Sequence, residues 1–215
     1  MDRIVLGHGS GGKLMHELIR EHFGPAFGIA GFGDSAILDM NPHKLAFTTD
    51  SYVVSPLFFP GGNIGELAVY GTVNDLAVSG ARPLFLTAGF IIEEGFPLEH
   101  LKAIVASMSG AAEKARIKIV AGDTKVVNKG KGDGIFINTS GVGILADGIE
   151  LSACKIRGGD TILVSGQVGN HGVAVMSERN GITFDPPVVS DTAPLNSLIE
   201  CICEVTKEIR FMRDP

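Results

Sequence analysis

Four aspartates lie beside or within apolar segments, where carboxylates are unusual. Asp34 precedes one predicted strand, and Asp50 and Asp123 each end another. Asp75 lies inside an apolar helix. Hard cations such as Mg²⁺ bind carboxylate oxygens together with phosphate oxygens and water. If the four acids converge, they could hold Mg²⁺ and a phosphorylated ligand. Taken separately, each could equally be a turn or capping residue.

Asp75 poses the sharpest chemical question. It lies with Asn74 in a predicted helix whose other residues are mostly small or apolar. Asn63 is a suitable N-cap for this helix, and Gly80 followed by Pro83 supplies the stop signal. A lone buried carboxylate is unfavourable unless it meets a cation or several hydrogen-bond donors. Its partner is therefore an arginine, a set of backbone N–H groups, or a metal ion that carries a phosphate.

Three further polar residues could take part in such a site. Lys125 follows Asp123 by two residues and could place a compact cation on a phosphate, or be a solvated loop lysine. His171 precedes a predicted helix, where it could lie near anion-binding N–H groups or simply start the helix. His8, in a glycine-rich loop, has the same ambiguity.

That loop, residues 7–13, reads Gly-His-Gly-Ser-Gly-Gly-Lys and partly fits two nucleotide-binding patterns. A P-loop requires Ser or Thr after the lysine, and Leu14 occupies that position. A dinucleotide-binding fold requires a second strand ending in an acid, whereas Glu21 lies within the first predicted helix. An anion-binding loop at a helix N-terminus remains, with Gly9 and Gly11 as its candidate contacts, as does a purely structural turn.

Composition narrows the class of protein. The 215 residues are 45% hydrophobic, enough for a sizeable core. A formal net charge of -6 argues against nonspecific binding to nucleic acid or to an anionic membrane. We expect no signal peptide and no membrane-spanning segment, because the apolar runs are too short or interrupted. Three cysteines without metal-ligand spacing indicate free thiols and a reducing cytoplasm.

Periodicity and turn signals predict the elements that position these residues. Strands are expected over residues 3–6, 36–40, 44–49, 84–92, 117–121, 135–145 and 161–165. Helices are expected over residues 12–23, 63–79, 172–179 and 192–209, with one more starting at Pro97. This order predicts an α+β fold with two long helices on one face of a sheet. The last sixty residues offer one strand and two helices, too little to close a sheet, so we place a domain boundary between residues 152 and 153.

Several short motifs resemble the aminoimidazole ribonucleotide synthetase-like ATP-binding superfamily. They are Gly33-Asp34-Ser35, Thr48-Thr49-Asp50-Ser51, Val73-Asn74-Asp75-Leu76-Ala77, Gly122-Asp123-Thr124 and the turn from Ser165 to Gly172. Others resemble one branch of it, the hydrogenase maturation family HypE. They are the loop at residues 7–13, Thr49 to Val53, Gly122 to Val127, and the run Pro-Leu-Phe-Phe-Pro-Gly-Gly-Asn from Pro56. The likeness extends over essentially all 215 residues.

The resemblance implies a fold, an activity and partners. Residues 1–152 would form an ATP-binding and dimerisation domain, and residues 153–215 the start of a second α+β domain. The family uses ATP to dehydrate an S-carbamoyl group on its own C-terminal cysteine to a thiocyanate, which supplies cyanide for [NiFe]-hydrogenase. Its members are homodimers whose partners are the carbamoyltransferase HypF and the HypC–HypD scaffold complex.

The resemblance also assigns site residues. It makes Asp34, Asp50, Asp75 and Asp123 the candidates for binding Mg²⁺ and ATP. Asn74 would neighbour the nucleotide, and Lys125 would contact phosphate or act in catalysis.

One departure from the family pattern concerns the end of the sequence. The family continues beyond the Arg213-Asp214-Pro215 motif and ends in the acceptor cysteine, so we expect an N-terminal fragment that is inactive alone. Two alternatives remain. The first is a small-molecule kinase or ligase of the same fold, such as thiamine-phosphate kinase; selenophosphate synthetase is disfavoured because Ser10 and glycines stand where it needs a reactive cysteine. The second is a noncatalytic dimerisation module.

Overall fold

A computed structural model describes residues 3–28 and 33–214. The chain divides into two compact units, Met1–Gly33 and Asp34–Pro215, and each is described by itself. The boundary expected between residues 152 and 153 falls inside the second unit and stays a prediction. Among the described residues, no helix is both long and apolar enough to cross a membrane.

The first unit is helical. Its elements are the 3-10 helix η1 (Leu6–Gly9), the α-helix α1 (Lys13–Leu18), the π-helix η2 (Ile19–Phe23) and the α-helix α2 (Gly24–Phe27). The strand expected over residues 3–6 is wrong, because the chain turns locally and the Val5 N–H donates to His8 Nδ1 at 3.1 Å. The expected helix forms, but it continues past Gly24. Pro25 falls in the first turn of α2, where its missing N–H is not needed.

The second unit is built on a five-stranded sheet in the order β1-β2-β7-β5-β6. Its strands are β1 (Ala36–Met40), β2 (His43–Tyr52), β5 (Ala81–Glu93), β6 (Lys118–Val127) and β7 (Ile135–Leu145). Neighbouring strands are antiparallel except β5 and β6, which are parallel. Two short strands, β3 (Phe58–Phe59) and β4 (Gly62–Asn63), form a separate ladder.

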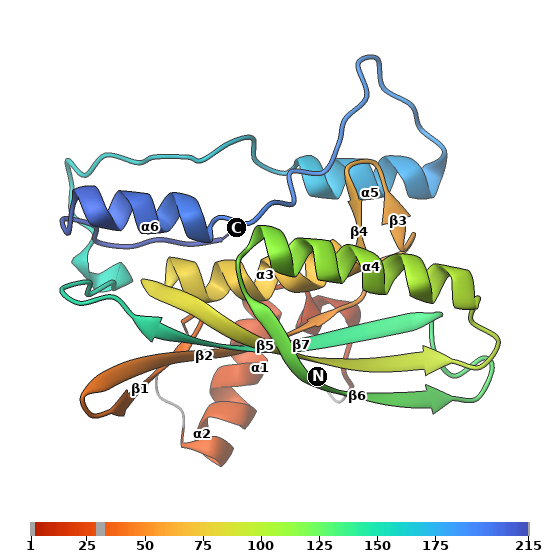
Figure 1. The fold of residues 1–215 in the computed structure, drawn as a ribbon, viewed down its shortest axis with the longest axis horizontal. Helices are drawn as coiled ribbons and strands as arrows, with labels where there is room; N and C mark the ends of the chain where they lie inside the picture. The colour runs from red at the N-terminus through yellow and green to blue at the C-terminus, as the bar shows by residue number, and fades with distance from the viewer. Residues whose placement is uncertain (1–2, 29–32, 215) are drawn as a thin grey trace. The chain divides into compact units, whose positions relative to one another are not determined.

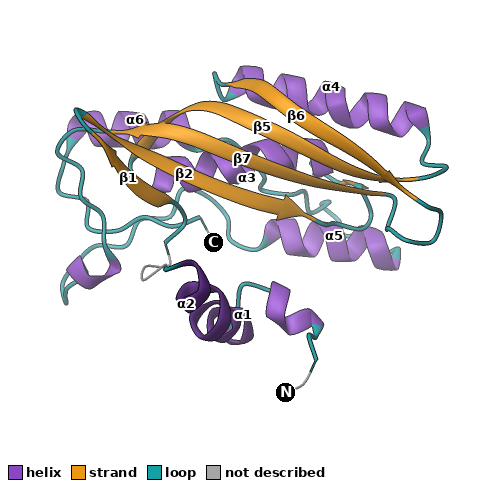
Figure 2. Ribbon diagram, turned by 90° about the horizontal axis from the view of Figure 1, so that it is seen from below, coloured by secondary structure: helices purple, strands orange, loops and turns teal. Residues whose placement is uncertain are grey.

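Four α-helices and one short 3-10 helix complete this unit. They are α3 (Ile64–Val78), α4 (Leu98–Lys114), η3 (Ala153–Lys155), α5 (Asn170–Asn180) and α6 (Asn196–Val205). The helices α3 and α4 run along one face of the sheet (Figures 1 and 2). This arrangement confirms the expected α+β class and its two long helices.

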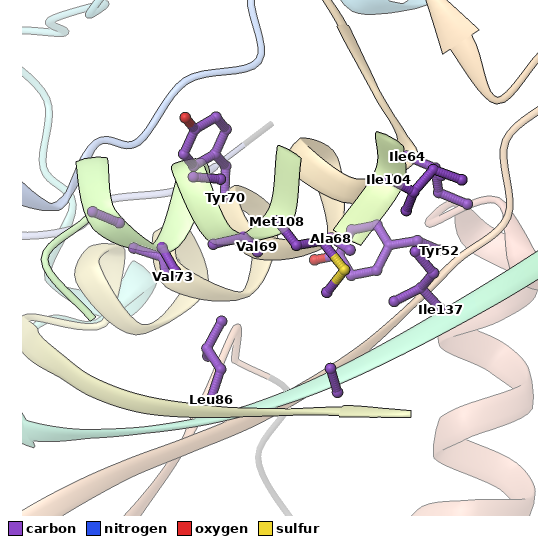
Figure 3. Close-up of a cluster of buried hydrophobic side chains, with 14 of the residues drawn as sticks. Tyr52, Ile64, Ala68, Val69, Tyr70, Val73, Leu86, Ile104, Met108 and Ile137 are labelled. Carbon is purple, nitrogen blue, oxygen red and sulfur yellow. The ribbon is translucent and has the colours of Figure 1, made fainter. Parts of the chain in front are cut away.

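Helix α3 is buried nearly all round, as its composition predicts. Asn63 caps its start by accepting a hydrogen bond from Gly65 N at 2.8 Å. On one side the main core joins α3 to α4 and the sheet (Figure 3). The end of α3 also contributes Ala77 and Val78 to a second cluster that includes residues of α6. Helix α4 approaches closely at Gly65, where a Cβ would lie 2.5 Å from the Ile104 carbonyl oxygen.

The strand expected over residues 161–165 is wrong. No strand is formed there, and the side chains of Ile162 and Leu163 are 87% and 84% exposed. A strand is held by hydrogen bonds to a neighbour, and within the described part of the chain this segment pairs with none. Apolar content alone therefore did not decide its structure.

Candidate functional acidic site

Strand β2 places one of the predicted acids on the helix side of the sheet. Asp50 pairs with Thr139, and Tyr52 pairs with Ile137. Thr139 and Ile137 are buried under α3, and paired residues of neighbouring strands point to the same face. Asp50 therefore faces α3. Because β2 runs on to Tyr52, Asp50 lies within the strand, not at its end.

Asp34 and Asp75 reach the same place from two other elements. Asp34 lies two residues before β1, and Asp75 lies in the last turn of α3. The Thr48 hydroxyl donates to the Asp34 carbonyl oxygen at 2.8 Å and lies 3.2 Å from Asp75 Oδ2. Ser35 Oγ donates to the Asp75 carbonyl oxygen at 3.2 Å. Thr48 thus joins the segment around Asp34 to the Asp75 side chain.

The pKa values of Asp75 and Asp50 are both raised. Burial raises the pKa of Asp75 to about 7, and the nearby charges of Asp50 and Asp34 add to the effect. The pKa of Asp50 is also raised, first by desolvation and then by the charge of Asp34, against hydrogen bonds that lower it. Repulsion between neighbouring carboxylates raises their pKa values, and a cation would relieve it. We call Asp34, Asp50 and Asp75 the acidic cluster.

A fourth acid and an arginine belong to this region and were missed in the sequence. Burial raises the pKa of Asp214, a hydrogen bond with Asn74 lowers it, and the charges of Asp34, Asp50 and Asp191 raise it further. Arg213 Nη1 lies 3.2 Å from Asp34 Oδ1. Asp214 carries no local signal, since an acid between an arginine and a proline in a loop usually faces water. Thr48 was missed because a threonine is ordinary in a strand.

Asn74 makes contacts that were not foreseen. Its amide donates to the Ala193 carbonyl oxygen at 3.0 Å and accepts from Leu195 N at 2.8 Å. The side chain is buried and holds the segment before α6 against α3. It also hydrogen-bonds Asp214 of the site region. Its predicted place beside a nucleotide stays a prediction.

Asp123 does not join the acidic cluster. Strand β6 continues through it to Val127, and Asp123 pairs with Gly89, one residue beyond the buried Ala88. Because side chains alternate along a strand, Asp123 and Lys125 point away from α3 and α4. The two side chains are exposed and form an ion pair with each other. The expectation that all four aspartates converge is therefore not met within this chain.

The glycine-rich loop belongs to the first unit. Gly9 ends η1, and Gly11 has a φ of 74°, a backbone conformation that favours glycine. Their proposed contact with a nucleotide stays a prediction.

His171 has a local structural role. Its backbone N–H donates to Asp191 Oδ1 at 2.9 Å, and its Nδ1 lies 3.0 Å from Ser190 Oγ. Burial lowers the pKa of His171, and Asp191 opposes that effect. The residue thereby fixes the segment around residue 190 at the start of α5.

The donor set suits a Mg²⁺–phosphate complex better than an isolated ion. Among residues 3–28 and 33–214, no three His, Cys, Asp or Glu side chains gather closely enough to hold a metal ion. Mg²⁺ commonly uses one or two protein carboxylates, with phosphate oxygens and water completing its shell. The acidic cluster provides such oxygen donors and excess negative charge.

Two hollows in the second unit lie away from the acidic cluster. One, of about 310 Å³, lies between the start of β5, the end of β7 and α6. Another, of about 710 Å³, lies between α4 and strands β5 and β6. No residue of the acidic cluster lines either hollow.

Comparison with known proteins identifies the family to which this fold belongs. Residues 32–145 match the family model described as AIR synthase related protein, N-terminal domain. The match covers more than half of the 215 residues, and the chain belongs to this family.

Within that family, the similarity is to HypE, as the sequence motifs predicted. The chain is 53% identical over 99% of its length to a carbamoyl dehydratase HypE of Bradyrhizobium diazoefficiens, and it spans 62% of that relative. A HypE–HypF complex structure has a TM-score of 0.86 and 55% identity, covering 92% of this chain and 65% of that one. A HypE structure in complex with ATP has a TM-score of 0.78 and 45% identity, covering 99% of this chain and 64% of that one.

Proposed function

We propose that the chain is the ATP-binding part of a carbamoyl dehydratase that serves hydrogenase maturation. The main observation that supports this proposal is its 45% identity, over 99% of its length, to a HypE solved with ATP. The acidic cluster supports the proposal, because ATP bound with Mg²⁺ brings a divalent cation to these carboxylates. The chain spans 62% of its first relative, so the proposal concerns this part of the reaction.

The chemistry proposed is the dehydration of an S-carbamoyl group on a C-terminal cysteine to a thiocyanate. An amide oxygen is a poor leaving group until ATP transfers its γ-phosphoryl group to it and leaves as ADP. The oxygen then departs with the phosphate, while a base removes the amide N–H protons as the C≡N bond forms. Mg²⁺, held by the carboxylates of Asp50 and Asp75, would neutralise negative charge on the phosphates. Asp50 and Asp75 would orient the nucleotide through their oxygens, while Thr48 holds the Asp75 carboxylate in place. Asp34 and Asp214 would add to the negative field that retains the cation.

Lys125 is the remaining candidate for contact with a phosphate. It lies on the face of the sheet opposite the acidic cluster and pairs with Asp123. A catalytic role for it would require the reacting groups to reach that face.

That face also supports a proposed homodimer. Phe47 and Phe85 both pair with Val142, so an apolar row crosses β2, β7 and β5. The two phenylalanines are 47% and 44% exposed. A second copy would cover them, as exposed apolar patches commonly mark interfaces.

The proposed protein partners are inferred from the related proteins. One related HypE was solved in a complex with HypF, and we propose HypF as a partner here as well. The HypC–HypD scaffold and a cytoplasmic location belong to the same proposal. A kinase of the same fold would also bind ATP, whereas a noncatalytic dimerisation module would not.

Calorimetric titration with ATP, with and without Mg²⁺, tests the proposal. Asp50→Asn and Asp75→Asn each remove a charged oxygen ligand, so we expect Mg²⁺-dependent affinity to fall by roughly tenfold to a hundredfold. Asp133→Asn, in the exposed turn between β6 and β7, is the matched control and should bind as the wild type does.

Asp123→Asn separates the two faces of the sheet. Because Asp123 points away from the acidic cluster, we expect this variant to retain its affinity for ATP. Absence of Mg²⁺-dependent ATP binding by the wild type would refute the proposed function. Unchanged binding by Asp75→Asn would remove the acidic cluster from it.

A further inference from the structure

A chain of buried hydroxyl groups runs from strand β2 into helix α3. The Tyr52 hydroxyl lies 3.1 Å from Thr72 Oγ1. Thr72 Oγ1 lies 2.5 Å from Thr139 Oγ1, which donates to the Ala68 carbonyl oxygen at 2.8 Å. Thr72 and Thr139 are fully buried, and Tyr52 is nearly so. This hydroxyl chain lies beneath the acidic cluster and has no part in the function proposed above.

The hydrogen bonds of the hydroxyl chain can run in two directions, which differ in the oxygen to which each hydroxyl donates. Each hydroxyl has one hydrogen to donate. If Thr139 donates to Ala68, then Thr72 donates to Thr139 and Tyr52 donates to Thr72. If the order reverses, Thr72 donates to Tyr52 and the Tyr52 hydrogen becomes free for another acceptor.

Asp50 is the candidate acceptor. It precedes Tyr52 by two residues on the same strand, so both side chains face α3. The Tyr52 hydroxyl is within hydrogen-bonding reach of the Asp50 carboxylate. The Asp50 carboxylate at the exposed end and the Ala68 carbonyl oxygen at the buried end therefore compete for hydrogen bonds from the hydroxyl chain.

The surrounding structure fixes where the Tyr52 hydroxyl lies. Figure 3 shows the Tyr52 ring among the core side chains below α3. A Cβ on Gly71 would overlap the Tyr52 hydroxyl, so the glycine provides the space that the hydroxyl occupies. The position of this donor is thus set by packing, and it has little freedom to follow a moving carboxylate.

We propose that Tyr52 is a positioning residue that holds the Asp50 carboxylate in the orientation that receives Mg²⁺-bound ATP, with the buried hydroxyl chain fixing its own hydroxyl. The inference rests on the proposed function. Tyr52 acts through Asp50 and does not touch the nucleotide. In the complex the hydroxyl chain donates toward Asp50, so this hydrogen bond contributes to the affinity for Mg²⁺-bound ATP.

Tyr52→Phe tests this role, because it removes the hydroxyl and keeps the ring in the core. We expect Mg²⁺-dependent affinity for ATP to fall about tenfold, the effect of losing one hydrogen bond to a charged group. Affinity for ATP without a divalent cation should not change. Tyr70→Phe, which removes the chain's other tyrosine hydroxyl from buried α3, is the matched control and should leave both affinities unchanged.

A double-mutant cycle distinguishes positioning from a general loss of structure. In an Asp50→Asn background, Tyr52→Phe should cause no further loss of affinity, because its target carboxylate is already gone. Electron paramagnetic resonance of bound Mn²⁺–ATP should show an altered metal environment in Tyr52→Phe and an unaltered one in Tyr70→Phe.

The outcomes separate the two proposals. Wild-type binding that Tyr52→Phe leaves unchanged overturns the positioning role alone. An equal loss on both the wild-type and the Asp50→Asn background also overturns it, since the effect would then be structural. Absence of Mg²⁺-dependent ATP binding by the wild type overturns the proposed function and the positioning role together.

Discussion

Replacing Asp75 with asparagine is expected to stabilise the fold at pH 8 while weakening the binding of Mg²⁺–ATP. The pKa of Asp75 rises from 3.8 to about 7 in the folded chain, first through burial and then through Asp50 and Asp34. The folded state therefore binds the proton more tightly than the unfolded state does. Stability is lost as the pH rises from about 4 to about 7, and the loss is complete above that range.

The size of the effect follows from the same values. A difference of about 3 pH units in pKa corresponds to about 4 kcal/mol, which is a ceiling. Relaxation and solvent around a half-buried group reduce this to roughly 2 kcal/mol. Asparagine has nearly the same shape, keeps an oxygen for the Thr48 hydroxyl and does not ionise. For a chain of this size we expect a rise in melting temperature of about 4–8 °C at pH 8.

Urea unfolding of both proteins at pH 8 and pH 5.5 measures the effect. Because pH 5.5 lies about midway between the two pKa values, roughly half of the stabilisation should remain there. Asp133→Asn provides the comparison for replacing an exposed carboxylate. Equal stabilisation at both pH values, or destabilisation at pH 8, would refute the reasoning about charge.

Two further predictions concern the contacts around the site and the open face of the sheet. Asn74→Ala removes the bonds to Ala193 and Leu195 and should cost about 2–4 kcal/mol in urea unfolding, with faster hydrogen exchange at the Leu195 amide. A protected Leu195 amide in this variant would contradict it. Phe47→Glu places a charge on the exposed apolar row and should convert a dimer to a monomer in sedimentation experiments. A wild type that sediments as a monomer would refute the proposed dimer.

The sequence predicted those elements whose own residues carry the signal. Helix α3 begins after Asn63 as expected, because a cap and a run of apolar residues are local features. The segment at residues 161–165 was mispredicted, because a strand depends on a neighbour that sequence periodicity does not supply. The strand predicted over residues 3–6 is replaced by a local turn, in which the Val5 N–H donates to His8 Nδ1.

The candidate site shows a similar division. Asp34, Asp50 and Asp75 were recognised as acids in unusual places, and the charges of Asp50 and Asp34 do raise the pKa of Asp75. Asp123 was grouped with them because its strand was expected to end near residue 121. The strand in fact runs to Val127, and side-chain alternation turns Asp123 to the opposite face. Whether Asp123 joined the site thus depended on where its strand ends and on the face of the sheet to which its side chain points.

The burial of α3 on both sides has a consequence for synthesis of the protein. Its end packs against α6, which follows it by more than a hundred residues along the chain. At about 5–20 residues per second, a ribosome adds the end of α6 about 6–25 s after the end of α3. During that interval the nascent chain exposes an apolar helix surface that its own later residues must cover. We therefore expect this surface to be bound by chaperones on the ribosome and to be released once α6 has emerged.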